Sequence, residues 1–174
     1  KALLSNAELM EKLQEKEAWG LKISGEISFD WEKTIGRSRD VAAKLNKGVE
    51  FLMKKNKIES IKGNANPLGR QGNNPCKIAV HEATVQDTRT DSPVSVGALK
   101  ETITATNIIV ATGSVARDLP FAKFDGDKIW GAREAMYNKS QPKSLIVVGA
   151  GAIGMEFGYF YHTFGTKVTV IEMM

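Results

Sequence analysis

The chain has 174 residues, of which 42% are hydrophobic and 25% charged, which is ordinary for a soluble globular protein. It contains no run of 18 apolar residues and no signal-peptide pattern, so neither a membrane span nor a leader is predicted. The net charge of +4 comes from Lys and Arg scattered among Asp and Glu, which argues against a nucleic-acid surface. Cys76 is the only cysteine, which excludes an intrachain disulfide and a cysteine metal cluster and favours a reducing compartment.

The first third of the chain predicts two helices. Residues 1–18 carry apolar side chains at helical spacing and predict a helix that ends near Gly20. Asp30 is a good N-cap for a second helix, which we expect to run from Trp31 to about Lys55 with an apolar stripe along one side. Because the chain opens with the pattern of a helix interior, and ends directly after a strand-like run, we expect it to be part of a longer enzyme.

Between the second helix and residue 115 the sequence predicts strands joined by polar loops. Two segments alternate apolar and polar residues, as half-buried strands do. A third is a continuous apolar run, typical of a strand buried on both faces, and it ends at Thr112-Gly113-Ser114. The predicted strands are Ile58–Gly63, Lys77–Val85, Lys100–Ala105 and Ile108–Ala111, with loops at Asn64–Pro75 and Asp87–Gly97.

The last part of the chain predicts a parallel βαβ unit. Its strands and helix follow a connector that contains one short helical piece near Ala132–Tyr137. The expected fold class is α/β, with helices and a small antiparallel sheet before this unit. We expect residues 1–115 to form one mixed region, residues 116–142 a connector, and residues 143–174 the start of a doubly wound domain. The expected elements of the unit are a buried strand at Ser144–Val148, a helix at Ala152–Phe164 capped by Gly165, and a strand at Lys167–Glu172.

A glycine-rich turn, Gly149-Ala150-Gly151-Ala152-Ile153-Gly154, joins the first strand to the helix. The first glycine permits a tight turn, the second lets a pyrophosphate approach the backbone, and the third lets helix and strand pack closely. Glu172 lies 18 residues after Gly154, where a carboxylate accepts hydrogen bonds from a ribose diol and repels a 2′-phosphate. The pattern predicts an NAD site; the alternative is a plain βα turn and a solvated strand end.

Glu156 has two interpretations. It falls in the expected first turn of the helix, where the helix dipole favours acidic residues. The other interpretation, implied only by the resemblance of the motifs to a known family, is that it faces the nicotinamide of a bound dinucleotide.

The motifs together resemble a known family. The run Ile108–Ser114, then Pro120, the glycine turn with Met155-Glu156, and Val168–Glu172 resemble the flavin-dependent pyridine nucleotide–disulfide oxidoreductases, and within them the dihydrolipoamide dehydrogenases. The opening Lys1-Ala2-Leu3-Leu4 is similar to the residues that follow that family's redox-active disulfide. The resemblance covers essentially the whole chain but only part of such an enzyme, which implies a fragment of a flavoprotein with two dinucleotide folds.

The resemblance implies contacts with two cofactors, FAD and NAD. Lys1 would lie near the flavin N5 edge and pair with Glu156, where a cation stabilises negative charge on the reduced ring. Ala65 would meet the FAD adenine, and Thr112-Gly113-Ser114 would pass the FAD. The alternatives are a surface lysine, an ordinary loop residue and a strand-ending turn. The residues expected at NAD are Gly149, Ala150, Gly151, Ala152, Ile153, Gly154, Met155, Glu156 and Glu172.

The same resemblance implies electron transfer from dihydrolipoyl groups of 2-oxo acid dehydrogenase complexes to a disulfide, then to FAD and NAD. It also implies a homodimer that works with lipoyl-bearing subunits, without nucleic acid or membrane, in the cytoplasm or a mitochondrial matrix. The family's paired cysteines, its first dinucleotide motif and its catalytic His–Glu pair are absent here. We therefore expect no catalytic residue and no metal site in this chain, and no activity from it alone.

Three alternatives to a dihydrolipoamide dehydrogenase remain. Mercuric reductase and glutathione reductase are close within the family, but Glu172 argues against the second, which uses NADP and needs cations there. A non-catalytic nucleotide-binding module is the alternative of a different class.

Overall fold

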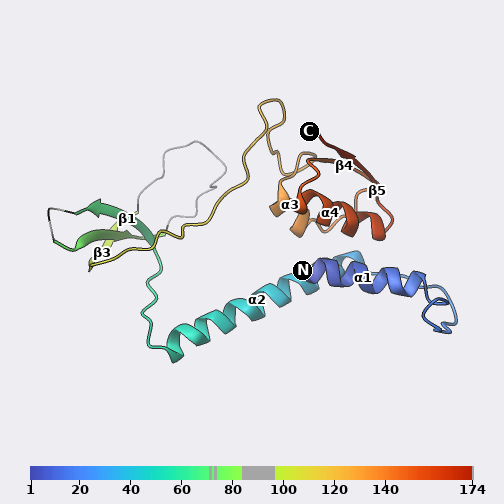
Figure 1. Ribbon diagram of the computed structural model, residues 1–174, viewed down its shortest axis with the longest axis horizontal. Helices are drawn as coiled ribbons and strands as arrows, with labels where there is room; N and C mark the ends of the chain where they lie inside the picture. The colour runs from blue at the N-terminus through green and yellow to red at the C-terminus, as the bar shows by residue number, and fades with distance from the viewer. Residues whose placement is uncertain (71, 73, 84–96, 174) are drawn as a thin grey trace. The chain divides into compact units, whose positions relative to one another are not determined.

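The structure is a computed structural model that describes residues 1–70, 72, 74–83 and 97–173 (Figure 1). Its residues fall into two units, each described below by itself. Unit 1 comprises Lys1–Phe51 and Phe121–Met174, and unit 2 comprises Leu52–Pro120.

Two helices open the chain. Helix α1 spans Ala2–Gln14 and α2 spans Trp31–Lys55, which confirms the predicted second helix at both ends. Asp30 is its cap, because its Oδ1 accepts the Lys33 N–H at 3.0 Å. Helix α1 ends earlier than predicted. The amides of Ala18 and Gly20 donate to carbonyls only three residues back, so the chain tightens into turns after α1.

The core of unit 1 joins these helices to α4 (Ala152–Thr163). Trp31, the first residue of α2, lies 5.3 Å from the rings of both Phe160 and Tyr161 of α4. Its indole N–H donates to the Asn138 carbonyl at 3.0 Å. The Tyr161 hydroxyl donates to the carbonyl of Ala135, in α3 (Ala132–Tyr137), at 2.8 Å. Apolar burial and satisfied polar groups therefore hold α4 against α2 and the segment around α3, and Leu145 and Val168, from the strands that flank α4, pack against the same cluster.

The sheet of unit 1 consists of β4 (Ser144–Val148) and β5 (Lys167–Ile171). They pair in parallel, with Ser144 opposite Lys167 and Val148 opposite Ile171, and this confirms the predicted βαβ unit. The prediction that Ser144–Val148 is a buried strand holds for only one face of β4. Leu145 and Val147 are half-buried, whereas Ile146 and Val148 are 63% and 55% exposed, because α4 covers only one face.

The end of α4 explains how the chain returns to the sheet. Gly165 has a φ of +95°, a left-handed conformation that glycine adopts without strain. Its N–H donates to the His162 carbonyl at 2.8 Å, and the Thr166 N–H donates to the Tyr161 carbonyl at 3.0 Å. This pair of bonds is a Schellman motif, which confirms Gly165 as the predicted cap.

Unit 2 contains an antiparallel sheet of β1 (Asn64–Gly69), β2 (Cys76–His81) and β3 (Leu99–Ala105), in that order. The second and third strands were predicted, whereas β1 lies in the segment predicted as a loop. The strand was not predicted because its proline and glycine residues indicate a loop in most contexts. Here β1 is an edge strand, where Pro67 is tolerated, and the register shifts between Pro67 and Gly69.

Two other predicted strands are wrong. Ile58–Gly63 and Ile108–Ala111 have no regular secondary structure, and Ile109 and Val110 are 92% and 74% exposed. A strand needs a neighbour for its backbone groups, and the sheets within the described ranges contain none for these runs. Strand β2 ends at His81 rather than Val85. Residues 84–85 and the predicted loop, except for Gly97, lie outside the described residues.

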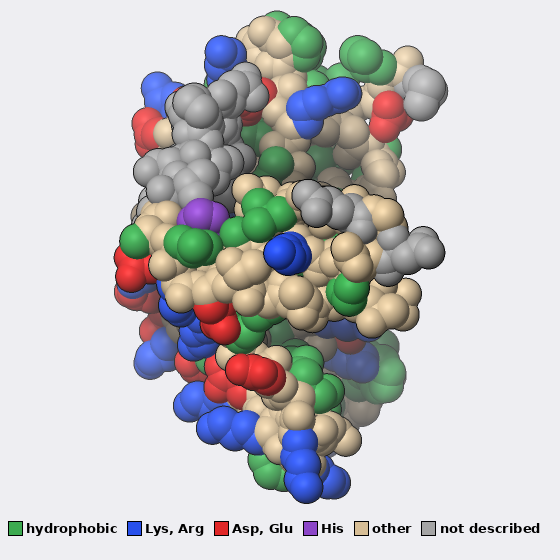
Figure 2. All heavy atoms as spheres, turned by 90° about the vertical axis from the view of Figure 1, so that its left-hand side faces the viewer, with side chains coloured by type: hydrophobic (Ala, Val, Ile, Leu, Met, Phe, Trp, Pro, Cys, Tyr) green, Lys and Arg blue, Asp and Glu red, His purple; other side chains and the backbone are tan. Residues whose placement is uncertain are grey.

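No helix in the described part of the chain is long and apolar enough to cross a membrane. On the face drawn in Figure 2, Lys and Arg side chains are interspersed with Asp and Glu.

Candidate dinucleotide-binding site

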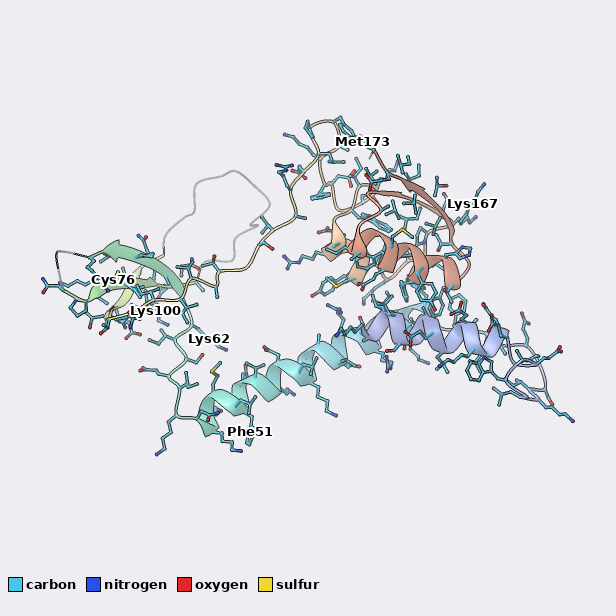
Figure 3. The ribbon with its side chains drawn as sticks, viewed as in Figure 1. Phe51, Lys62, Cys76, Lys100, Lys167 and Met173 are labelled. Atoms are coloured by element: carbon cyan, nitrogen blue, oxygen red, sulfur yellow. The ribbon has the colours of Figure 1, made fainter. Side chains whose placement is uncertain are left out.

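The candidate site lies at one edge of the parallel sheet of unit 1. Because β4 and β5 are parallel, their carboxyl ends meet at the same edge. The glycine turn leaves β4 there, and Glu172 directly follows β5. Figure 3 labels Lys167 at the start of β5 and Met173 beyond its end, so the two ends of the strand are easily distinguished. The fold therefore brings the predicted turn and the predicted acid together, at the edge where open α/β sheets bind ligands.

The three glycines of the turn have different surroundings. Gly149 has a φ of +107°, which L side chains rarely adopt. A Cβ at Gly154 would clash with the Gly149 carbonyl oxygen and lie 3.1 Å from Val147 Cγ1, so this glycine lets α4 approach β4. Gly151 has an ordinary extended backbone (φ −67°, ψ 173°), and a Cβ there would meet no atom within 4 Å. Among the described residues nothing crowds this position, so the space above Gly151 is open to a ligand.

The N-terminus of α4 opens onto the same place. Gly151 is its N-cap and provides no side-chain hydrogen bond. The first amides of an α-helix have no partner within the helix, so those of Ala152 and Ile153 can donate to a ligand. The helix dipole adds a partial positive charge. The arrangement suits a phosphate or pyrophosphate group.

Glu172 lies directly against the turn. Its Oε2 accepts the Ala150 N–H at 2.7 Å, and its Oε1 accepts the Met173 N–H at 2.7 Å. The side chain is exposed, so an incoming group can reach it. A carboxylate here places negative charge beside the donors of the turn, as the sequence pattern predicts for a ribose acceptor.

Glu156 and Lys1 lie in unit 1, and both are exposed. Glu156 is the fifth residue of α4 and lies beyond its first turn, contrary to the prediction. Met155 beside it is 48% exposed. The ion pairs of the described chain do not join Lys1 to Glu156. Whether either residue faces a cofactor stays a prediction.

The residues expected at FAD are placed less specifically. The Lys1 carbonyl accepts the Ser5 N–H at 2.9 Å, so Lys1 is the N-cap of α1. Ala65 lies in β1, opposite Val80, rather than in a loop. Thr112-Gly113-Ser114 is exposed, and Gly113 has a φ of +80°. In Figure 3, Lys62, Cys76 and Lys100 mark the sheet region of unit 2, and the Lys100 Nζ donates to the Lys62 carbonyl at 2.9 Å. The FAD assignments remain predictions.

The sequence interpretation missed one residue of the unit. A Cβ at Gly158 would lie 3.7 Å from Val168 Cγ1 and 4.0 Å from Val170 Cγ2, so Gly158 lets α4 pack closely on β5, as Gly154 does on β4. The signal was available, because two small residues four positions apart lie on the same helix face.

Metal binding has no support in the described residues, where no three His, Cys, Asp or Glu side chains gather. His81 is half-buried, and its Nδ1 lies 3.0 Å from the Gly97 carbonyl oxygen. This contact gives the His81 ring a structural partner within unit 2.

Known proteins resemble this chain along its whole length. Dihydrolipoyl dehydrogenases of Rhizobium etli, Chlorobaculum tepidum and Bacillus subtilis are 42%, 41% and 32% identical to it, over 99–100% of the chain. The chain spans only 33–35% of these relatives. The crystal structure of LpdA from Mycobacterium tuberculosis superimposes with a TM-score of 0.82 at 24% identity, over 99% of this chain and 34% of that one, which confirms the α/β fold.

The match to a family model is equally extensive. Residues 2–174 match the model described as pyridine nucleotide-disulphide oxidoreductase. This match and the relatives confirm the resemblance inferred from the motifs. The chain belongs to the pyridine nucleotide-disulphide oxidoreductase family.

Proposed function

We propose that this chain is the central part of an NAD-linked, FAD-dependent dihydrolipoyl dehydrogenase. The observation that carries the proposal is the glycine turn held against Glu172 at the carboxyl edge of the parallel sheet. The named relatives support the choice of this enzyme among members of the family. Bound FAD would take electrons from a dihydrolipoyl group through a redox-active disulfide, and bound NAD would accept them as hydride.

The residues of the turn would bind NAD. The first amides of α4 would hold the pyrophosphate, and the missing Cβ of Gly151 leaves the space for its approach. Glu172 would accept hydrogen bonds from the adenosine ribose and repel the extra phosphate of NADP. Met155 and Glu156 would line the path toward the nicotinamide. Residues 143–174 would thus begin the NAD domain, after a connector at 116–142.

Residues 1–115 would belong to the FAD domain. Lys1 would stabilise negative charge at the flavin and pair with Glu156 once the cofactors are bound. Ala65 would contact the adenine, and Thr112-Gly113-Ser114 would pass along the FAD. These assignments rest on the resemblance and on the exposure of the residues concerned.

The whole enzyme would act as a homodimer on lipoyl-bearing subunits of 2-oxo acid dehydrogenase complexes, in the cytoplasm or a mitochondrial matrix. This chain would be inactive by itself. Its single cysteine cannot form the required disulfide, and the family's catalytic His–Glu pair has no counterpart in its sequence.

The test is the activity and absorbance of the full-length protein that contains this chain. We expect a yellow protein that oxidises dihydrolipoamide with NAD and much more slowly with NADP. The 174-residue chain alone should show no turnover. A colourless, folded full-length protein that binds NAD without this activity would favour a nucleotide-binding module, and NAD(P)H-dependent reduction of mercuric ion would favour mercuric reductase.

A further inference from the structure

The carboxylate of Glu172 makes a contact that ribose recognition does not require. Its Oε2 accepts the Ala150 N–H at 2.7 Å. One residue earlier, the Gly149 N–H donates to the Ile171 carbonyl at 2.8 Å. The first two amides of the turn are thus both held by the end of β5, one by backbone and one by a side chain.

The side-chain positions at the start of the turn are open. A Cβ at Gly149 or Gly151 would meet no atom within 4 Å, and Ala150 is exposed. The Gly149 carbonyl lies against Gly154 of α4, and the hydrogen bonds from the end of β5 restrain the amides of Gly149 and Ala150. The bond to an ionised carboxylate is the stronger kind.

The two halves of the turn therefore have different tasks. Gly149 and Ala150 use their amides to fix the turn to β5. Ala152 and Ile153, at the N-terminus of α4, keep theirs for a ligand. An ionised carboxylate offers about four lone-pair sites, so accepting the Ala150 N–H does not by itself prevent Glu172 from accepting ribose hydroxyls.

We propose that Glu172 is a positioning residue for the pyrophosphate site, in addition to any contact with ribose. It holds the first half of the glycine turn so that the α4 amides are presented in the binding geometry. The proposal rests on the proposed function, because it concerns how the same turn binds a dinucleotide. It requires that a ligand without a ribose diol also binds more weakly when the acceptor at position 172 is lost.

The test compares two variants of similar side-chain length in the full-length, flavin-containing protein. Glu172→Met removes the oxygen acceptor, and Glu172→Gln keeps one. Calorimetric titrations use ADP, which has the ribose diol, and 2′,3′-dideoxy-ADP, which lacks it. Lys167→Ala is the control, because Lys167 is exposed at the opposite end of the same strand.

We expect Glu172→Met to weaken the binding of 2′,3′-dideoxy-ADP about 3–10-fold, the range of one lost hydrogen bond. Glu172→Gln should restore it to within about twofold, since a neutral acceptor still serves the Ala150 N–H. Without nucleotide, amide hydrogen exchange of residues 149–154 should be faster in Glu172→Met than in Glu172→Gln. Lys167→Ala should change neither measurement.

The outcomes separate this proposal from the proposed function. If Glu172→Met weakens ADP but leaves 2′,3′-dideoxy-ADP and the exchange rates unchanged, Glu172 acts on the ribose alone and the positioning role is overturned. If the unaltered protein binds neither NAD nor ADP, both proposals fail together.

Discussion

The βαβ unit at the end of unit 1 and the sheet of unit 2 show how differently two regions of one chain depend on their surroundings. In the βαβ unit, two parallel strands and their crossover helix are consecutive in sequence. The strands hydrogen-bond to each other, and the helix packs on both of them. In unit 2, the apolar run Ile108–Ala111 has the pattern of a central strand but remains exposed. A βαβ unit contains the hydrogen-bonding partner of each of its strands within one short stretch of sequence. An apolar run such as Ile108–Ala111 becomes a strand only when a neighbouring strand from elsewhere is present.

The largest effect should follow removal of a core side chain of unit 1, which packs the βαβ unit against its neighbours. Phe160 is 1% exposed and lies 5.2–5.3 Å from the rings of Trp31, Tyr161 and Phe164. We expect Phe160→Ala to lower the free energy of unfolding of the 174-residue chain by about 3–5 kcal/mol. Denaturant unfolding measures this change. The matched control is Phe121→Ala, since Phe121 is 77% exposed and its loss should cost less than about 0.5 kcal/mol.

The exposed run of unit 2 gives a prediction that depends on the length of the protein. Ile109 is 92% exposed here, so Ile109→Ala should change the stability of this chain by less than about 0.5 kcal/mol. In the full-length protein we expect the run to gain a partner strand, and the same substitution to cost about 2–5 kcal/mol. Equal, small effects in both proteins would show that the run is a surface segment, and the contrast between the two regions would be lost.

The glycine turn offers a contrast within the βαβ unit. A Cβ at Gly154 would meet the backbone of Gly149, whereas one at Gly151 would meet nothing. Gly154→Ala should therefore destabilise the chain by about 1–3 kcal/mol through overpacking. Gly151→Ala should leave stability nearly unchanged and reduce NAD affinity in the full-length protein. If Gly151→Ala bound NAD normally, the space above Gly151 would not be the pyrophosphate site.

The smallest effect concerns alkaline pH. Burial raises the pKa of Tyr161 to about 12, above the value of about 10 of an unfolded chain. Because the folded pKa is the higher one, this contribution to stability is complete below pH 10 and is lost as the pH rises from 10 toward 12. Tyr161→Phe should abolish that part of the pH dependence. It should also cost about 1 kcal/mol at neutral pH through the lost bond to the Ala135 carbonyl. Parallel unfolding curves at pH 8 and pH 11 measure both effects.

The sequence predicted best where the signals were local. The cap at Asp30, the Schellman glycine at Gly165 and the turn at Gly149–Gly154 each depend on residues a few positions apart, and the structure contains all three. Strand β1 was missed because its Pro and Gly residues are acceptable only on a sheet edge, a property that depends on pairing with β2. The approach of Glu172 to the turn followed from strand order, but its bond to Ala150 required the three-dimensional geometry.

The most direct test of the account is the NAD affinity of the full-length protein with and without the Glu172 carboxylate. Glu172→Ala should weaken NAD binding by about 1–3 kcal/mol in a calorimetric titration, as expected for a lost charged acceptor. It should also reduce the preference for NAD over NADP. An unchanged NAD affinity would contradict the assignment of this edge of the sheet as the NAD site.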